Sequence, residues 1–181
     1  MPAPSLPVVL VLASGRGERF IASGGQGSKL RARLGTMTVL EHTLAAVRAS
    51  GLPWHLEEGG HAGMGDSIAA AARATPDAGG WLVLPGDLPL IHPDTLRAVA
   101  RALAQHEVVV PTHEGQRGHP VGFGKDCGAQ LRALTGPQGA ASIVRARGAH
   151  ELPVPDAGCI TDIDTLQDLA RAHARLEAGL T

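Results

Sequence analysis

Short apolar runs alternate with segments of helical periodicity along most of this chain. Residues 8–12 and 81–84 are wholly apolar, and continuous runs of this length are typical of strands that are buried on both faces of a sheet. Residues 107–111 and 119–123 predict two further strands, and residues 53–57 predict a short one. Strands that recur with helical segments between them indicate a sheet whose strands are joined by crossover helices.

Capping signals mark the beginnings of several helices. Thr38 and Glu41 form a capping box, which predicts a helix from Thr38 to about Ser50 with Gly51 as its C-cap. Pro93, as the first residue of a helical segment, predicts the start of another helix. Further helices are expected over residues 67–74 (capped by Gly65 or Asp66), 127–134, 140–147 and 165–177, a loop over residues 15–38, and an extended segment over residues 152–160.

This alternation predicts a single α/β domain over residues 1–181. We expect a three-layer α/β/α architecture with a Rossmann-like, mostly parallel sheet. In such sheets ligands bind at the carboxyl ends of the strands. Residues that follow the predicted strands are therefore the first candidates for a functional site.

Charge and composition exclude several classes of function. The chain carries 16 Lys and Arg against 17 Asp and Glu, aromatic residues make up 2% of it, and Tyr is absent. A nucleic-acid-binding protein would need a basic surface or aromatic stacking platforms, so we expect no nucleic-acid partner. Residues 1–12 lack a basic segment and their apolar run is short, which favours a buried strand over a signal peptide or membrane span. We therefore expect no membrane association and a cytoplasmic location.

A glycine-containing loop follows the first predicted strand and is the first candidate for binding phosphate. It includes Leu12, Ala13, Ser14, Gly15 and Gly17. Backbone N–H groups in such a loop can point at an anion, and Arg19 and Lys29 would add positive charge. A tight strand-to-helix turn is an equally good interpretation of the glycines alone. The loop matches neither a dinucleotide fingerprint, because Glu18 and Arg19 stand where glycine is needed, nor a Walker A loop, because Leu30 follows Lys29.

Two aspartates are candidates for binding a metal ion. Asp87 directly follows the 81–84 strand, between Pro85 and Pro89, and a carboxylate at that position suits Mg²⁺. A turn aspartate that bonds to its own loop is the plain alternative. Asp164 is the second candidate ligand, although the segment taken by itself favours Asp164 or Thr165 as the N-cap of the last helix.

Two further segments could contact ligands. Met64, Asp66 and Ser67 lie in a turn of small residues that could receive the edge of a nucleobase, and a capped glycine-rich turn explains them equally well. His119 precedes Pro120 at the start of a predicted strand and is placed to face a second ligand.

Taken together, these motifs resemble the MobA-like NTP-transferase family, and most closely its molybdenum cofactor cytidylyltransferase branch. The resemblance runs along nearly the whole chain in the family's order. It comprises Leu12, Ala13, Gly15, Arg19 and Lys29; Gly63 to Ile68; Gly86, Asp87 and Pro89; Gly118 to Val121; and Asp162 to Thr165 with Asp168 and Leu169.

The resemblance implies a nucleotide-diphospho-sugar-transferase-like fold and a Mg²⁺-dependent transfer of a nucleoside monophosphate from an NTP to a phosphorylated small molecule such as molybdopterin. Arg19 and Lys29 would hold the triphosphate, and Asp87 and Asp164 would hold Mg²⁺. The nucleotide would contact Leu12, Ala13, Ser14, Gly15, Gly17, Met64, Asp66 and Ser67, and the acceptor would contact His119, Pro120, Gln138 and Gly139. Ala13 followed by Ser14, in place of two glycines, favours CTP over GTP. The sequence leaves the oligomeric state open.

Three departures from the family pattern keep an alternative open. Additional residues, 21–27, separate Arg19 from Lys29; the chain between Ser50 and Gly63 is shorter than in the family; and the acceptor segment at residues 136–141 lacks charged residues. The alternative is a non-catalytic nucleotide-binding sensor or partner protein with the same fold. A nicotinamide-dependent oxidoreductase is a third hypothesis, but it would need glycine near Arg19.

Overall fold

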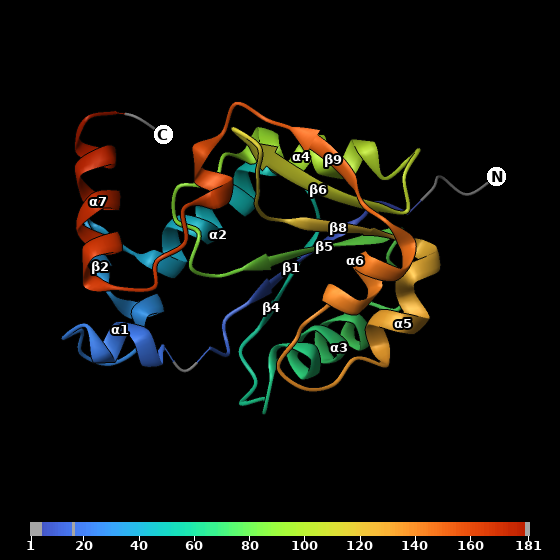
Figure 1. Ribbon diagram of the computed structural model, residues 1–181, viewed down its shortest axis with the longest axis horizontal. Coiled ribbons are helices and arrows are strands. Elements are labelled where there is room, and N and C mark those ends of the chain that lie inside the picture. The colour runs from blue at the N-terminus through green and yellow to red at the C-terminus, as the bar shows by residue number, and fades with distance from the viewer. Residues whose placement is uncertain (1–4, 16, 180–181) are drawn as a thin grey trace.

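A twisted seven-stranded sheet forms the centre of the computed structural model, which describes residues 5–15 and 17–179 (Figure 1). The strand order is β4-β1-β5-β8-β6-β7, with β9 paired to β6. The strands of this sheet are β1 (Val8–Leu12), β4 (Trp54–Glu57), β5 (Gly80–Pro85), β6 (Val108–His113), β7 (Gln116–Arg117), β8 (Val121–Gly124) and β9 (His150–Pro153). β2 (Arg33–Leu34) and β3 (Met37–Thr38) form a separate small hairpin.

The strand directions confirm the expected mostly parallel sheet. β1 pairs in parallel with β4 and β5, and β6 pairs in parallel with β9. β8 is antiparallel to both of its neighbours, β5 and β6, so β6 runs in the same direction as β5. The carboxyl ends of β1, β4 and β5 therefore meet at one edge of the sheet.

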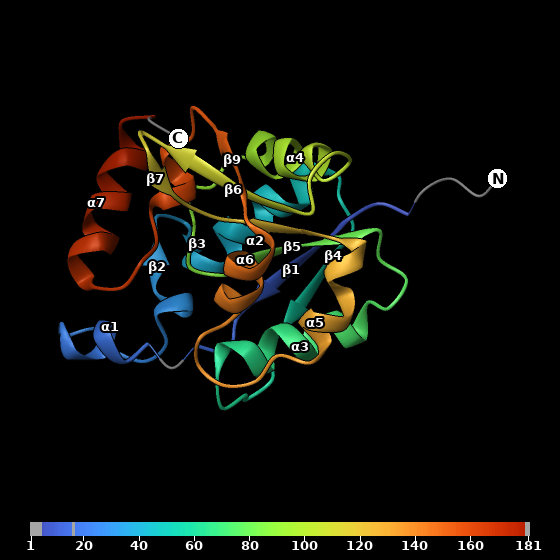
Figure 2. The same ribbon diagram turned by 45° about the vertical axis from the view of Figure 1, so that its right-hand side comes forward.

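Helices cover both faces of the sheet, which confirms the three-layer architecture (Figures 1 and 2). α2 and α4 lie on one face, and α3, α5 and α6 lie on the other. α1 and α7 lie beyond the carboxyl edge. The helices are α1 (Glu18–Ala22), α2 (Val39–Ser50), α3 (Met64–Ala74), α4 (Pro93–Ala102), α5 (Gly128–Arg132), α6 (Ala141–Arg147) and α7 (Leu166–Glu177), with 3-10 turns η1 (Lys29–Arg31), η2 (Lys125–Cys127) and η3 (Ala157–Ile160).

Alternation along the central strands divides the core between the two faces. Val9 and Val11 of β1 pack towards α2 and α4, whereas Leu10 and Leu12 pack towards α3 and α5. All four side chains are buried. Since burying one such side chain stabilises a fold by about 1.5–3 kcal/mol, β1 is a major source of stability and a rigid base for the loop that follows it.

Three predicted segments differ from the structure. Residues 15–38, expected as a loop, contain α1, η1 and the β2–β3 hairpin, because Phe20, Leu30 and Leu34 are buried in a third core cluster with Ile163 and Ala172. The helix expected at residues 67–74 already begins at Met64. The extended segment expected over residues 152–160 divides into β9 and η3. In each case tertiary packing or a local turn adds structure that the apolar pattern does not show.

Within the described ranges, none of the helices combines the length and apolar character that a membrane crossing needs.

Candidate functional site

Two loops meet at the carboxyl edge of the sheet and form the base of the site. The Gly86 N–H donates to the carbonyl oxygen of Leu12 at 2.9 Å, which ties the turn after β5 to the end of β1. A Cβ atom at Gly86 would lie 2.9 Å from Leu40 Cδ1 and 3.1 Å from Leu12 O. A larger residue would therefore displace Leu40 and crowd Leu12 O, so the contact favours glycine and helps to fix the position of Asp87.

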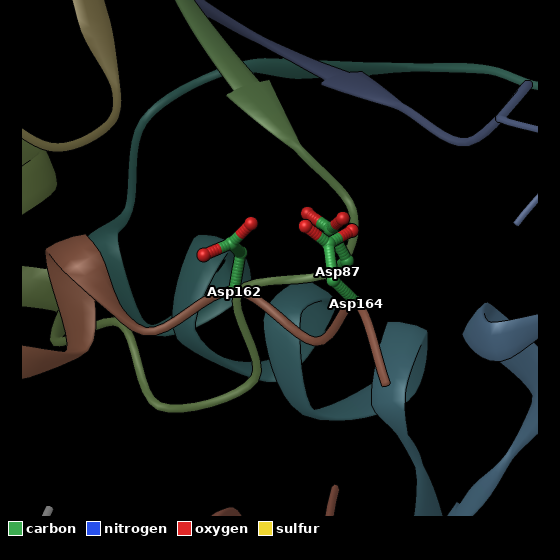
Figure 3. A group of neighbouring side chains, drawn as sticks. All are labelled: Asp87, Asp162 and Asp164. Atoms are coloured by element: carbon green, nitrogen blue, oxygen red, sulfur yellow. The ribbon is translucent and has the colours of Figure 1, made fainter. Parts of the chain in front are cut away.

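Three carboxylates converge beside this base (Figure 3). Oxygen atoms of Asp87, Asp162 and Asp164 all lie within 4.8 Å of one another. The Ile163 N–H donates to Asp87 O at 3.0 Å, and this bond holds the segment before α7 against the turn after β5. The structure thus brings together the two aspartates that the sequence singled out, although they are far apart in the chain.

Asp162 is the member of this acidic cluster that the sequence analysis did not propose as a ligand. The alternation of Asp162, Ile163 and Asp164 in the sequence could have indicated that both aspartates face the same side. Ile163 is fully buried, whereas the aspartates on either side of it are not. In extended chain, alternate residues share a side, so burying the isoleucine turns both carboxylates towards the site.

Lys29 and Arg19 neutralise much of the negative charge. Lys29 Nζ lies 2.6 Å from Asp87 Oδ2 and 2.8 Å from Asp164 Oδ1, and Arg19 Nη1 lies 2.7 Å from Asp164 Oδ2. Burial by itself would lower the pKa of Lys29, but the two carboxylates outweigh that effect and raise it above its ordinary value. The lysine therefore reaches the cluster despite the additional residues before it, because these residues fold into α1 and its following turn.

The pKa values of the aspartates respond to this arrangement in opposite directions. Burial raises the pKa of Asp164, but the hydrogen bond and charge of Lys29 and the charge of Arg19 outweigh burial and lower the pKa overall. Desolvation, followed by the negative charge of Asp164, raises the pKa of Asp162. Asp87 Oδ1 is buried and accepts no hydrogen bond from the residues that the structure describes.

The helix cap beside the cluster is Thr165, not Asp164. Thr165 Oγ1 accepts from the Asp168 N–H at 3.2 Å, and Asp168 Oδ2 accepts from the Thr165 N–H at 2.8 Å. Asp168 Oδ2 also accepts from the Asp164 N–H at 3.2 Å. The capping box thereby anchors the backbone of Asp164 and leaves its carboxylate to face Lys29.

Lys29 and Asp87 line a pocket of about 340 Å³. Five of the predicted nucleotide-binding residues line it: Leu12, Ser14, Gly15, Met64 and Ser67. The hydroxyl groups of Ser14 and Ser67 lie 2.5 Å apart, and either can donate to the other. His61, from the turn after β4, also lines the pocket, and the sequence analysis did not single it out.

The other predicted nucleotide-binding residues lie elsewhere. Ala13 lines a different cavity, together with Leu40 and Glu58. Gly17 lies beside Arg19 and Lys29, outside the lining of the 340 Å³ pocket. Asp66 Oδ2 accepts from the Gly136 N–H at 3.0 Å, so its carboxylate ties α3 to the loop before α6. Arg16, between the two loop glycines, is outside the described residues.

A second pocket, of about 300 Å³, is lined by all three aspartates of the cluster and shares Lys29, Met64, Pro85 and Asp87 with the first. Of the predicted acceptor-binding residues, His119 lines it; Pro120, Gln138 and Gly139 do not. Burial lowers the pKa of His119, and its Nδ1 atom is buried with no hydrogen-bond partner in the described part of the chain. Arg19, Gln116 and Arg117 also line this pocket, and the sequence analysis proposed neither Gln116 nor Arg117.

Comparison of the sequence with models of known protein families shows which family the chain belongs to. The sequence model of the MobA-like NTP transferase domain matches residues 45–152, more than half of the chain. The chain belongs to the MobA-like NTP transferase family. It is therefore a nucleotidyltransferase, and the matched residues include Asp87 at the carboxyl edge of the sheet.

Solved structures with similar folds cover almost the whole of this MobA-like chain. Rv0371c from Mycobacterium tuberculosis H37Rv is 25% identical with a TM-score of 0.78, and the match covers 95% of this chain and 99% of that one. The same protein in complex with manganese is 24% identical with a TM-score of 0.73, over 95% and 100% of the two chains.

Two further structures share the fold at lower identity. Molybdopterin-guanine dinucleotide biosynthesis protein A from Archaeoglobus fulgidus is 19% identical with a TM-score of 0.69, over 94% of this chain and 99% of that one. The 2-C-methyl-D-erythritol 4-phosphate cytidylyltransferase from Thermus thermophilus is 23% identical with a TM-score of 0.67, over 93% and 98%. A search of the curated proteins returned no match to this chain.

Proposed function

We propose that this nucleotidyltransferase moves a nucleoside monophosphate from an NTP, with CTP favoured, onto a phosphorylated small-molecule acceptor and releases pyrophosphate. One observation carries the proposal: two pockets adjoin at Lys29 and Asp87, which line both of them together with Met64 and Pro85. The NTP would occupy the pocket that Ser14 and Ser67 line, and the acceptor would occupy the pocket that His119 lines. Their reacting groups would then meet beside Asp87.

The reaction joins two anions, so their repulsion is the main barrier to approach. An oxygen of the acceptor phosphate would form a bond to the α-phosphorus of the NTP, and the bond from that phosphorus to the oxygen bridging to the β-phosphate would break. Lys29 and Arg19 are placed to donate to the triphosphate and to stabilise the negative charge that the leaving pyrophosphate gains. This chemistry requires no nucleophile from the protein.

The acidic cluster fits a divalent cation, and we propose Mg²⁺. Asp87 and Asp164, with Asp162 beside them, offer the hard oxygen donors that Mg²⁺ prefers. The Oδ1 atom of Asp87 is buried and accepts no hydrogen bond in the described part of the protein, so it is available as an oxygen ligand for a metal ion. The manganese complex of Rv0371c supports a divalent metal in a protein of this fold. When bound, the cation would supply positive charge between the two phosphates.

The choice of CTP over GTP rests on the Ala13–Ser14 pair, and molybdopterin as acceptor rests on the sequence resemblance. Both therefore stay proposals within the nucleotidyltransferase class. The remaining assigned contacts do not line the pockets assigned to these ligands, so their roles stay predictions: Ala13, Gly17 and Asp66 for the nucleotide and Pro120, Gln138 and Gly139 for the acceptor. The cytoplasmic location also stays a prediction.

A pyrophosphate-release screen tests the proposal directly. Each of the four NTPs is combined with molybdopterin and with other phosphorylated acceptors, in Mg²⁺ and in EDTA. We expect release with one NTP and one class of acceptor in Mg²⁺, and none in EDTA. NTP binding without release for every acceptor would favour the non-catalytic alternative.

Asp87→Asn is the matching variant. The loss of one charged contact at a transferring phosphate is worth about 3 kcal/mol, so we expect turnover to fall at least ~100-fold. The control is Asp94→Asn, because Asp94 is an exposed aspartate on α4 that pairs with Arg97 and lines neither of the two pockets. Near-normal turnover of Asp87→Asn, with an unchanged melting temperature, would remove Asp87 from the mechanism.

A further inference from the structure

A polar arrangement at the end of β4 extends from the sheet edge into the wall of the nucleotide pocket. Glu57 is the last residue of β4, and His61 lies four residues later in the turn that leads to α3. His61 lines the 340 Å³ pocket together with Ser14, Met64 and Ser67. The site described above gives this histidine no role.

The turn holds the His61 ring in one orientation. Glu57 Oε1 lies 3.0 Å from His61 Nε2 and accepts from the Gly59 N–H at 3.0 Å. A Cβ atom at Gly59 would lie 2.5 Å from His61 Nε2 and 2.8 Å from Glu57 Oε1, so a larger residue there would displace these two side chains. The side chains of Glu57 and His61 are only 15% and 24% exposed, which shields their contact from water.

The contact also determines which ring nitrogen carries the proton. Burial raises the pKa of Glu57, but the hydrogen bonds from His61 and from the Gly59 N–H outweigh burial and hold the pKa below its ordinary value. Glu57 is therefore an ionised carboxylate, which only accepts hydrogen bonds, and His61 Nε2 must donate to it. In the neutral imidazole Nδ1 is then an acceptor, and it makes no hydrogen bond within residues 5–15 and 17–179.

We propose that His61, positioned by Glu57, is a specificity-determining residue that reads the nucleobase and selects bases with an exocyclic amino group, cytosine first. This inference rests on the proposed function, because it assigns the base to the Ser14–Ser67 pocket. The amino group at position 4 of cytosine can donate to Nδ1. Uracil has the same size and shape but presents a carbonyl oxygen at that position, so two acceptors would face each other.

The expected preference follows from the cost of an unmatched polar pair. Leaving a partly buried acceptor without a donor costs enough to lower affinity by about tenfold or more. CTP and UTP share the ribose and the triphosphate, so the ratio of their dissociation constants isolates the contribution of the base.

His55 provides a matched control. Its Nε2 atom lies 3.4 Å from Glu57 Oε2, so it contacts the same carboxylate, but it does not line the nucleotide pocket. A purely structural role for the His–Glu contacts would make His55 and His61 variants behave alike. If His61 recognises the base, only the His61 variants should change the preference for CTP over UTP.

Isothermal titration of the full chain with CTP and with UTP, in Mg²⁺, tests the inference. We expect the wild type to bind CTP at least about tenfold more tightly than UTP. His61→Ala should reduce this ratio to below about twofold by weakening CTP binding, and His55→Ala should keep the wild-type ratio. His61→Phe fills the volume of the ring without an acceptor and should behave like His61→Ala, which guards against a folding defect in the smaller variant.

Three results would overturn the inference: equal binding of CTP and UTP by the wild type, tighter binding of GTP than of CTP, or an unchanged ratio in both folded His61 variants. In those cases NTP binding itself would still support the proposed function. If the wild type bound no NTP at all, the proposed function would fail first and the base assignment with it.

Discussion

At the scale of single residues, Lys29 carries the main positive charge at the centre of the site. Its side chain is 13% exposed and contacts two carboxylates that are equally shielded or nearly so. Removing one partner of such a contact leaves negative charges that water reaches poorly, and the cost is larger than for an exposed ion pair. The same ammonium group is the donor that we assign to the triphosphate.

Lys29→Met should therefore destabilise the fold by about 2 kcal/mol, between the values for exposed and fully buried pairs. It should also weaken NTP binding at least tenfold. Urea denaturation and titration with CTP measure the two effects. Lys125→Met is the control, since Lys125 is exposed and lines neither pocket. If both variants lost the same stability, the charge balance described for the cluster would be wrong.

At the scale of secondary structure elements, α2 and α7 both begin with a capping box, but the two boxes lie in different parts of the molecule. α2 begins with the capping box of Thr38 and Glu41, and α7 begins with that of Thr165 and Asp168. Only the second box also holds the backbone of Asp164. The capping box of α7 thus contacts a residue of the acidic cluster, whereas that of α2 does not.

Thr165→Ala and Thr38→Ala should each lower the free energy of unfolding by about 1 kcal/mol, the usual effect of losing an N-cap hydroxyl. Thr165→Ala should in addition weaken Mn²⁺ binding several-fold, because Thr165 Oγ1 also donates to the Asp168 carboxylate that holds the Asp164 N–H. Chemical denaturation gives the first quantity and direct titration with Mn²⁺ gives the second. Equal Mn²⁺ affinity in the two variants would show that the α7 cap does not position Asp164.

At the scale of the whole molecule, the two buried thiols should make the free energy of unfolding decrease as the pH rises through the alkaline range. Burial raises the pKa of Cys159 to about 11, from an ordinary value of 9.0. The unfolded chain loses this proton first, so the contribution is fully present below pH 9 and is lost as the pH rises from 9 to 11. Burial also raises the pKa of Cys127, in the same direction, and the chain has no Tyr to obscure the effect.

The shift at Cys159 corresponds to a loss of about 2–3 kcal/mol between pH 9 and pH 11. We expect the free energy of unfolding of the wild type to fall by about that amount over this range, and that of Cys159→Ala to fall less. Urea titrations at about pH 8, 9.5 and 10.5 compare the two slopes. Parallel curves for the two proteins would contradict the assignment.

The amino-acid sequence by itself determined the architecture and the loops that bear chemistry. The apolar runs of β1 and β5, the capping box at Thr38 and the position of Asp87 after a buried strand are local patterns, because they record which side of the chain is buried and where a helix can start. The ordered motifs likewise led to the MobA-like NTP transferase family.

Only the tertiary structure decided which side chains meet. Lys29 contacts both Asp87 and Asp164, and Asp164 lies 135 residues after Lys29 in the chain. Asp162 completes the acidic cluster. Asp66 bonds to the loop before α6 instead of lining the nucleotide pocket. These contacts depend on how crossover connections bring distant loops to one edge of the sheet, and local periodicity holds no information about that. The position of His61 in the pocket wall follows from the same closure, since its neighbours there come from β1 and β5 as well as from α3.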